Sequence, residues 1–552
     1  MASVRRSRTR SVALTVAVAL GLVAAACGDD ASEDSSGAAA TAATTAAGAS
    51  AAATTVAGTT VPKDVNPDGI LKVGTSLELT GGLALDPTKS VTISDEPWIL
   101  NIYGSLMRSN PKGGYDPWFA KSVDIVDSKT VKVTLNTGIT FSDGTPYDGA
   151  AVKTGIMRNY NTPQATAKAG QNSLFRELSD IVVDGPTQVT FQLKTAVAGE
   201  FLAVLAGREA AVPSPKAIAD GVDLNTKPVG AGPYTLTDFK TGQIMSLRRN
   251  PNFFQKDKWL LGGFDFVHVA NAASGVNGLL AGDVDFSAVD IPNAARVESS
   301  GNYTLNQSYT DFSYIVMIFC STKPPFDNLK ARQAVQYALD RNIMNTNYLL
   351  GKGKVAYGYW TEDHPNFNPA IKPFATPDVA KAKQLLAESG VNPAIDLAFV
   401  PGTGQQPLAE IVQNQLNNVG FKVTLQGSND IVGTFITPQK PGVMMVPGSR
   451  TGVDKVNKIF QTGSQQNLCG SVRPEIESLA QQVAAFSPSD PKVAEIYKQI
   501  DLLVAQNAYA LFLVNTPRLF AFNKSKVGGT PVDVPTKSTV PYQNFEGIYI
   551  KK

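Results

Sequence analysis

Histidine and cysteine, the residues that most often supply nucleophiles, general bases and metal ligands, are scarce in this sequence. There are two histidines, His268 and His364, and three cysteines, Cys27, Cys320 and Cys469. No H-E-x-x-H, G-x-S-x-G or G-x-x-x-x-G-K-[ST] motif occurs, so zinc-protease, hydrolase-elbow and P-loop chemistry have no support. We therefore expect no enzyme, no metal site and no cofactor.

The two histidines lie in different settings. His268 is part of the alternating segment Phe266–Val269, which is typical of a strand, where a histidine usually serves packing. His364 lies in the loop sequence Thr361–Pro365 and is better placed to meet a ligand. Carboxylate pairs are plentiful, so a hydrolase stays open as an alternative, but no motif favours it.

The chain begins with the layout of a secretory signal peptide. An arginine-rich stretch, Arg5–Arg10, precedes the apolar run Val12–Ala26, which ends in small residues before Cys27. The run is about fifteen residues long, whereas a membrane-spanning helix needs roughly twenty. We predict a signal peptide over 1–26 rather than a permanent transmembrane helix.

Val23–Cys27 resembles a bacterial lipobox, which implies that the Cys27 thiol is acylated and anchors the chain in a membrane. A signal peptide with an incidental cysteine is the alternative. Residues 35–60 are Ala, Thr, Ser and Gly except for Val56, which is too little apolar surface to offset chain entropy. We predict a flexible tether over 27–65, with an alanine-rich helix as the alternative.

The charge balance excludes one class of partner. The chain has 49 Lys and Arg against 47 Asp and Glu, and removal of the four leader arginines leaves 45 against 47. A near-neutral chain without a long basic run lacks the electrostatic footprint of a nucleic-acid binder. We expect no nucleic-acid partner.

Short β-branched runs alternate with helical stretches after Pro62, which is typical of a mixed α/β protein. Ile70–Gly74 reads as a first strand, and Val131–Leu135 and Val189–Leu193 alternate apolar and polar residues as one-face-buried antiparallel strands do. Asp378–Gly390 begins with an acidic N-cap and ends with a C-cap glycine. A second punctuated helix, Leu408–Val419, precedes the strand Phe421–Leu425.

Several blocks in a fixed order carry a family resemblance. They are Ile139–Tyr147 (ITFSDGTPY), Lys227–Tyr234 (KPVGAGPY), Leu247–Phe253 (LRRNPNF), Leu280–Asp285 (LAGDVD), Pro324–Arg341 (PPFDNLKARQAVQYALDR) and Asp378–Gly390 (DVAKAKQLLAESG). Together they resemble the family 5 extracellular solute-binding proteins, which serve peptide, dipeptide and nickel ABC transporters. In physical terms, Asp143–Gly144 closes a turn before a helix that Asp148 caps. Gly230 and Gly232 permit a tight crossing.

The resemblance implies a two-lobed periplasmic-binding-protein-like fold with an extra domain on the first lobe. Its boundaries, carried onto this chain, place the first lobe at 66–105, 225–309 and 527–552. The extra domain would be 106–224 and the second lobe 310–526.

The resemblance also implies a function. The chain would be the extracytoplasmic substrate-binding component of an ABC importer, a monomer that hands a small, peptide-like or other solute to permease and ATPase subunits. It would be lipid-anchored to the outer face of the cytoplasmic membrane, or periplasmic. An exported ligand-binding lipoprotein that signals or acts as a chaperone, without a permease, is the alternative.

Candidate ligand contacts follow from both lobes. In peptide-binding relatives the segment after L-D-P lines the cleft, and in this chain it contains Val91, Thr92 and Ile93; an ordinary loop is the alternative. The second-lobe stretch lacks the aromatic residue and the acid that bind a peptide's ammonium group, and has Ser449 and Arg450 instead.

A guanidinium at position 450 favours a carboxylate or phosphate over an ammonium group. We therefore expect a solute other than a free-amino peptide, with an anionic ligand as one option and Trp360 as a stacking wall. A solvated surface role for Arg450 stays open. Export makes a Cys320–Cys469 disulfide plausible, with two buried thiols as the alternative.

Overall fold

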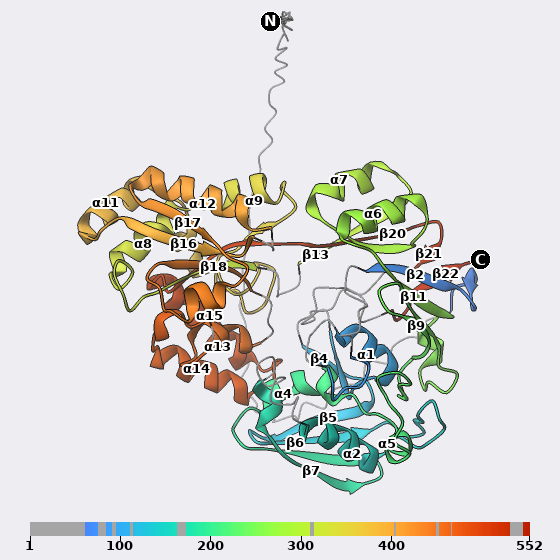
Figure 1. The fold of residues 1–552 in the computed structure, drawn as a ribbon. Coiled ribbons are helices and arrows are strands. Elements are labelled where there is room, and N and C mark those ends of the chain that lie inside the picture. The colour runs from blue at the N-terminus through green and yellow to red at the C-terminus, as the bar shows by residue number, and fades with distance from the viewer. Residues whose placement is uncertain are drawn as a thin grey trace, which may run out of the picture. The chain divides into compact units, whose positions relative to one another are not determined.

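The structure, a computed structural model, describes residues 61–75, 84–90, 95–110, 114–162, 173–309, 314–401, 404–448, 452–464, 466–529 and 545–552. Residues 61–552 form one compact unit. It is a mixed α/β unit with several sheets, and Figure 1 shows helices packed against them.

The first large sheet has seven strands in the order β13-β20-β12-β2-β11-β10-β9. Strands β11 and β12 both run parallel to β2, whereas β20 and β9 pair antiparallel with their neighbours. Its strands are β2 (Ile70–Thr75), β9 (Tyr234–Lys240), β10 (Ile244–Arg249), β11 (Gly263–His268), β12 (Phe286–Val289), β13 (Tyr303–Ser308) and β20 (Arg518–Asn523). The helices beside it are α1 (Glu96–Tyr103), α6 (Ala272–Ala281) and α7 (Ile291–Ser299).

The second large sheet has six strands in the order β15-β19-β14-β18-β16-β17. Its strands are β14 (Tyr314–Phe319), β15 (Lys354–Val355), β16 (Ala394–Phe399), β17 (Lys422–Gly427), β18 (Val443–Gly448) and β19 (Ala510–Asn515). Its helices are α8 (Leu329–Ala338), α9 (Arg341–Tyr348), α10 (Lys372–Ala375), α11 (Val379–Ser389), α12 (Gln406–Val419), α13 (Asp454–Phe460), α14 (Pro474–Ala485) and α15 (Pro491–Gln506).

Strand β14 is buried on both faces and separates two hydrophobic cores. Ile315, Met317 and Phe319 pack in one core with residues of α8 and α12. Val316 and Ile318 pack in the other core with residues of α13, α14 and α15. Because successive side chains of a strand point to opposite faces, an all-apolar strand can hold helical layers on both sides.

A third, four-stranded antiparallel sheet has the order β5-β6-β8-β7. In β6 every second residue is buried, as its alternating sequence predicts. The elements of this region are β3 (Met107–Ser109), β4 (Tyr115–Pro117), β5 (Ala120–Asp127), β6 (Thr130–Leu135), β7 (Leu178–Gly185), β8 (Gln188–Leu193), α2 (Gly149–Tyr160), α4 (Ala198–Leu205) and α5 (Pro215–Ala219). A small sheet joins β1 (Val65–Asn66), β22 (Tyr549–Lys551) and β21 (Val527–Gly528).

The predicted helix and turn signals are confirmed. The Asp148 side chain accepts a hydrogen bond from the Ala151 N–H at the start of α2, and Asp378 does the same for Lys381 at the start of α11. Gly390 ends α11 in the left-handed conformation. A Cβ on Gly230 would lie 2.2 Å from the Ile102 carbonyl oxygen, so the predicted close crossing is real.

One boundary differs from the sequence-based expectation. Residues up to 526 were expected in the second lobe, but β20 (518–523) pairs with β12 and β13 in the seven-stranded sheet. The chain therefore returns to the first large sheet directly after β19, because Arg518–Asn523 supplies the antiparallel partner of β13. The other domain boundaries stay a prediction.

The described helices also bear on the membrane. Within the described residues, none combines the length and the apolar composition that crossing a bilayer requires.

Candidate ligand-binding site

A cavity of about 310 Å³ opens between two sides of the unit. The hairpin β3–β4 and helix α4 form one side, and the loop after β15 together with α14 and α15 forms the other. Its described lining is rich in rings and prolines: Asn110, Gly114, Tyr115, Glu200, Trp360, His364, Pro365, Asn366, Gly452, Val483, Phe486, Pro488, Ser489, Asp490, Pro491, Val493, Ala494 and Tyr497. A wall of this kind suits a small solute that buries much of its surface.

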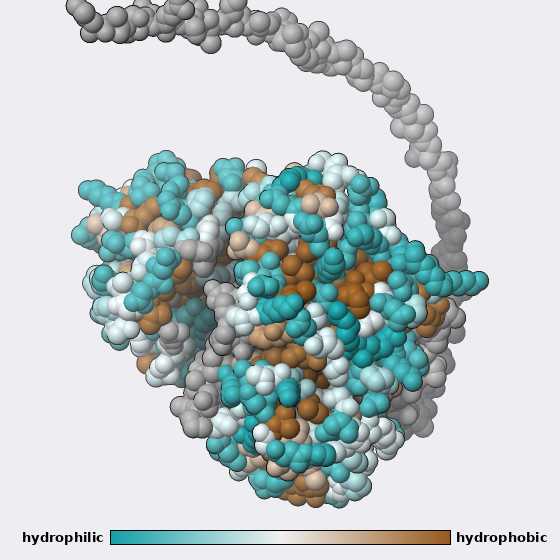
Figure 2. Space-filling view, turned by 45° about the vertical axis from the view of Figure 1, so that its right-hand side comes forward, coloured by the Kyte–Doolittle hydropathy of each residue, from teal (hydrophilic) through white to brown (hydrophobic). Residues whose placement is uncertain are grey.

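On the face shown in Figure 2, exposed apolar residues form patches that are separated by hydrophilic residues. A concave site is therefore a better guide to ligand binding than surface hydropathy. Scattered apolar residues are normal on a soluble surface and need no function.

Three aromatic rings form the wall on the side of the six-stranded sheet. The Trp360 indole stacks on the His364 imidazole, with 4.3 Å between ring centroids, and meets the Tyr497 ring edge to face at 4.9 Å. The His364 Nδ1 accepts a hydrogen bond from the Asn366 N–H at 3.1 Å. This bond fixes the imidazole against the indole, so the wall is preformed.

Helix α4 reaches the opposite wall through a buried carboxylate. The Glu200 Oε1 accepts a hydrogen bond from the Val453 N–H at 3.1 Å, although the two residues are 253 positions apart. Glu200 is only 5% exposed. A Cβ on Gly452 would lie 2.5 Å from the Glu200 Oε2, so a glycine is needed for this approach.

A second glycine brings the same helix against α14. A Cβ on Gly199 would lie 1.6 Å from the Phe486 carbonyl oxygen, a distance that no real Cβ can occupy. The side chain of Val197 packs against the core that contains α14 and α15. Helix α4 thus joins the two sides of the cavity by backbone approach, a hydrogen bond and apolar contact.

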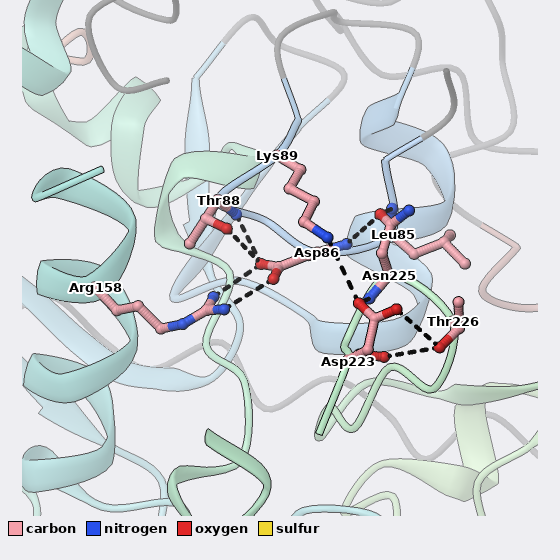
Figure 3. A network of polar contacts seen from close by, with 8 residues as sticks. All are labelled: Leu85, Asp86, Thr88, Lys89, Arg158, Asp223, Asn225 and Thr226. Atoms are coloured by element: carbon pink, nitrogen blue, oxygen red, sulfur yellow. Dashed lines mark hydrogen bonds and ion pairs between the residues drawn. The ribbon is translucent and has the colours of Figure 1, made fainter. Parts of the chain in front are cut away.

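The loop of Leu85–Pro87 is held by two other segments (Figure 3). Arg158 of α2 donates two parallel hydrogen bonds to the Asp86 carboxylate, each 2.8 Å long. The Leu85 N–H donates to the Asn225 side chain at 2.9 Å. Burial alone raises the pKa of the Asp86 carboxyl, but the bonds from Arg158 and Thr88 outweigh it and hold the pKa below its ordinary value.

The sequence-predicted ligand contacts have different outcomes. Trp360 lines the cavity, although it is covered by neighbouring rings and is only 5% exposed. The remaining predicted positions, Val91, Thr92, Ile93, Ser449, Arg450 and the lipid-attachment residue Cys27, lie outside the described residues.

The structure joins Cys320 and Cys469 in a disulfide, with an S–S distance of 2.02 Å. It links the end of β14 to the segment before α14. In the described part of the chain, no three His, Cys, Asp or Glu side chains are grouped as metal ligands.

Sequence reasoning missed Glu200, Phe486 and Tyr497. Each is an ordinary residue in or next to a helix, and no motif marks it. The usable signals were the residue type of Trp360 and the loop position of His364, and both residues line the cavity.

Comparison with known proteins places these features in a family. The sequence profile of the bacterial extracellular solute-binding proteins, family 5 Middle, matches residues 114–447. The chain is 29% identical to the glutathione-binding protein GsiB of Salmonella paratyphi A over 313 residues, which cover 54% of this chain and 58% of that protein. It is 25% identical to the nickel-binding periplasmic protein of Escherichia coli K12 over 487 residues, which cover 81% and 89%.

A solved structure agrees at the level of the fold. The ABC transporter substrate binding protein CtaP from Listeria monocytogenes superposes with a TM-score of 0.74 at 21% identity, covering 88% of this chain and 100% of that one. The two-lobed binding-protein fold expected from the sequence is thereby confirmed. Since the family profile also matches more than half of the chain, the chain belongs to the family 5 extracellular solute-binding proteins of bacteria.

Proposed function

We propose that the chain is the extracytoplasmic substrate-binding component of an ABC importer and that it holds a small solute in the cavity beside Trp360. The observation that carries this proposal is the ring-lined cavity of about 310 Å³ between α4 and the helices of the six-stranded sheet. A volume of this order matches a ligand of small-molecule size. Permease and ATPase subunits are its proposed partners.

The proposed mechanism is a shift in population towards a closed state. A solute that contacts both α4 and the Trp360 wall gains its full affinity only when both walls are in place. Its binding then favours this arrangement by the difference in affinity between the open and closed states. The Glu200–Val453 hydrogen bond is a contact between the same two walls, so we expect it to contribute to closure.

The chemistry of the cavity limits the ligand class. Among the described lining residues the acidic side chains are Glu200 and Asp490, and neither Lys nor Arg is present. In the sequence Arg450 is two positions before Gly452, which is one of the lining residues. We propose a solute with an apolar or ring-bearing part for the aromatic wall and an acidic group for Arg450.

A thermal-shift screen tests the proposal. Reduced glutathione, a Ni²⁺–histidine complex, short peptides and sugar acids are the probes. Ligand at about a hundred times its dissociation constant adds about 2.7 kcal/mol. With about 2.1 cal/mol/K per residue, a unit of about 490 residues should then melt about 3 °C higher. A bound solute that is recovered unchanged after incubation agrees with a binding protein, whereas turnover would contradict it.

The two histidines provide a matched control for the site. His364→Ala should weaken the best probe because it removes a ring from the cavity wall. His268→Ala, at the end of β11, should not change the affinity. Equal effects of the two substitutions would remove the cavity from consideration.

Arg450→Ala tests the acidic group. A charge-assisted hydrogen bond contributes about 1.5 to 3 kcal/mol, so an acidic probe should bind at least about tenfold more weakly, while a neutral analogue is unaffected. An unchanged affinity for the acidic probe would leave Arg450 as a solvated surface residue.

We also propose a lipid anchor at Cys27. In the native host the mature protein should partition with the membrane, and Cys27→Ser should release it. Membrane association that persists in this variant would contradict lipidation.

A further inference from the structure

Two buried side chains of opposite charge form hydrogen bonds with the backbone of Tyr359 behind the cavity wall. The Asp501 Oδ1 accepts a hydrogen bond from the Tyr359 N–H at 3.2 Å. The Lys455 Nζ donates to the Tyr359 carbonyl oxygen at 3.3 Å. Lys455 is 1% exposed and Asp501 is 2% exposed. The backbone N–H and the carbonyl oxygen of Tyr359 are thus bound by a buried carboxyl group and a buried amino group, respectively.

The same ammonium also contacts the next residue along the chain. The Lys455 Nζ lies 3.4 Å from the centroid of a Trp360 ring, a close cation–π contact. Trp360 lines the cavity and stacks on His364. The cation therefore touches a ring that belongs to the ligand wall.

Helix α15 connects this arrangement with the cavity. Val493, Tyr497 and Asp501 are four residues apart in turn, so they lie on one face of the helix. Val493 and Tyr497 line the cavity, and Tyr497 meets the Trp360 ring. Asp501 lies one turn further along α15, where its hydrogen bond with the Tyr359 N–H supports the loop that contains Trp360.

We propose that Lys455 and Asp501 are positioning residues of the ligand site, which act through the Tyr359 backbone and the Trp360 indole. The proposal rests on the proposed function, because it takes the cavity beside Trp360 as the place where the solute binds. A buried charge pair is a costly way to hold a loop. It is suited to a position where the orientation of one ring matters.

The surroundings of Asp501 make this support dependent on pH. Its Oδ2 has no hydrogen-bond partner among the described residues. Burial raises the pKa of Asp501 to about 7, against the opposing effects of the Tyr359 N–H and the Lys455 charge.

Arg341 and the Tyr359 hydroxyl, which also lie near Asp501, titrate far from neutrality. Arg341 of α9 borders the same small internal cavity as Asp501, and burial lowers its pKa only to about 10. Burial, Tyr314 and Asp501 raise the pKa of the Tyr359 hydroxyl above its ordinary value. Of Asp501, Arg341 and Tyr359, the carboxyl of Asp501 is therefore the group that changes charge near pH 7.

A spectroscopic titration tests the proposal without any ligand. The emission of Trp360 is isolated by subtracting the spectrum of Trp360→Phe from that of the wild type. Loss of the Asp501 charge changes the field at Lys455 and hence at the indole, so the difference signal should titrate with a midpoint at about pH 7. Asp501→Asn should abolish this midpoint, and Lys455→Met should abolish most of its amplitude.

His364 provides the control, because histidine as a residue type commonly changes charge near neutral pH and the His364 ring stacks on the same indole. His364→Gln should keep the midpoint if Asp501 is responsible. A flat wild-type signal, or a midpoint that survives Asp501→Asn and disappears in His364→Gln, would overturn the proposal. If Asp501→Asn fails to fold, the Lys455→Met and His364→Gln variants still decide between the two groups.

A ligand measurement separates this proposal from the proposed function. The ionised fraction of Asp501 falls from about nine-tenths at about pH 8 to about one-tenth at about pH 6 for a pKa of about 7. Reduced glutathione should therefore bind about tenfold more weakly at the lower pH, and Asp501→Asn should remove this ratio. If glutathione binds at neither pH, glutathione is not a solute of this protein, while the Trp360 titration still tests the positioning role.

Discussion

The Asp86–Arg158 pair offers a sharp test of how the L-D-P loop is held (Figure 3). The perturbation is Arg158→Ala, which removes both 2.8 Å bonds to a carboxylate that is 3% exposed. Removing one partner of a buried pair costs about 3 to 5 kcal/mol, because the other charge stays buried. The Arg158 side chain is 29% exposed, so we expect the lower end, about 3 kcal/mol.

This loss converts into a measurable melting shift. At about 2.1 cal/mol/K per residue, a unit of about 490 residues loses about 1 °C per kcal/mol, so Arg158→Ala should melt about 3 °C lower. Lys153 lies on the same helix in an exposed pair with Asp180 and is a matched control. Lys153→Ala should shift the melting point by less than about 1 °C, because exposed ion pairs contribute little.

The pH dependence of the loss has a defined sign. The pKa of Asp86 is lowered in the folded protein, so the unfolded carboxyl takes up its proton first as the pH falls. The stabilisation is therefore complete above the ordinary value of 3.8 and is lost as the pH falls through the lower folded value. The difference between wild type and Arg158→Ala should shrink in acid. Equal melting shifts for Arg158→Ala and Lys153→Ala at neutral pH would refute the reasoning.

Two further predictions concern the scaffold of the cavity. Replacing Cys320 and Cys469 by serine opens a crosslink with a sequence separation of 149, and chain entropy predicts a loss of about 5 kcal/mol. Calorimetry with and without reductant checks this, and identical melting points would contradict it. Gly199→Ala should lower the melting point, because its Cβ would overlap the Phe486 carbonyl. Gly278→Ala in α6 should raise the melting point through helix propensity, because the nearest atom would lie 3.7 Å from the new Cβ. The reverse order of the two melting points would contradict the packing argument.

Local sequence signals predicted local structure well. The Asp378–Gly390 segment contains its own start and stop, and the structure has a helix with those caps. Strand β6 alternates because a strand with one buried face requires it. These features depend on interactions within a few residues, so they can be read from the chain without knowledge of its neighbours.

The ligand site was predictable only in part. Trp360 and His364 stood out by residue type and loop position, and both line the cavity. Glu200 and Asp501 did not stand out, because a helical carboxylate is usually solvent-exposed. What distinguishes them is burial against Val453 and Tyr359, which the sequence places 253 and 142 positions away.

The sequence by itself predicted several individual strands and capped helices and the resemblance to a binding-protein family, because those rest on short-range patterns. Tertiary structure alone decided that β20 returns to the first large sheet and that α4 meets α14 through Gly199. It also decided that Lys455 and Asp501 both bind the backbone of Tyr359, next to Trp360. The physical reason is that burial and charge pairing are properties of packed surfaces. They arise only when distant segments exclude water from the same place.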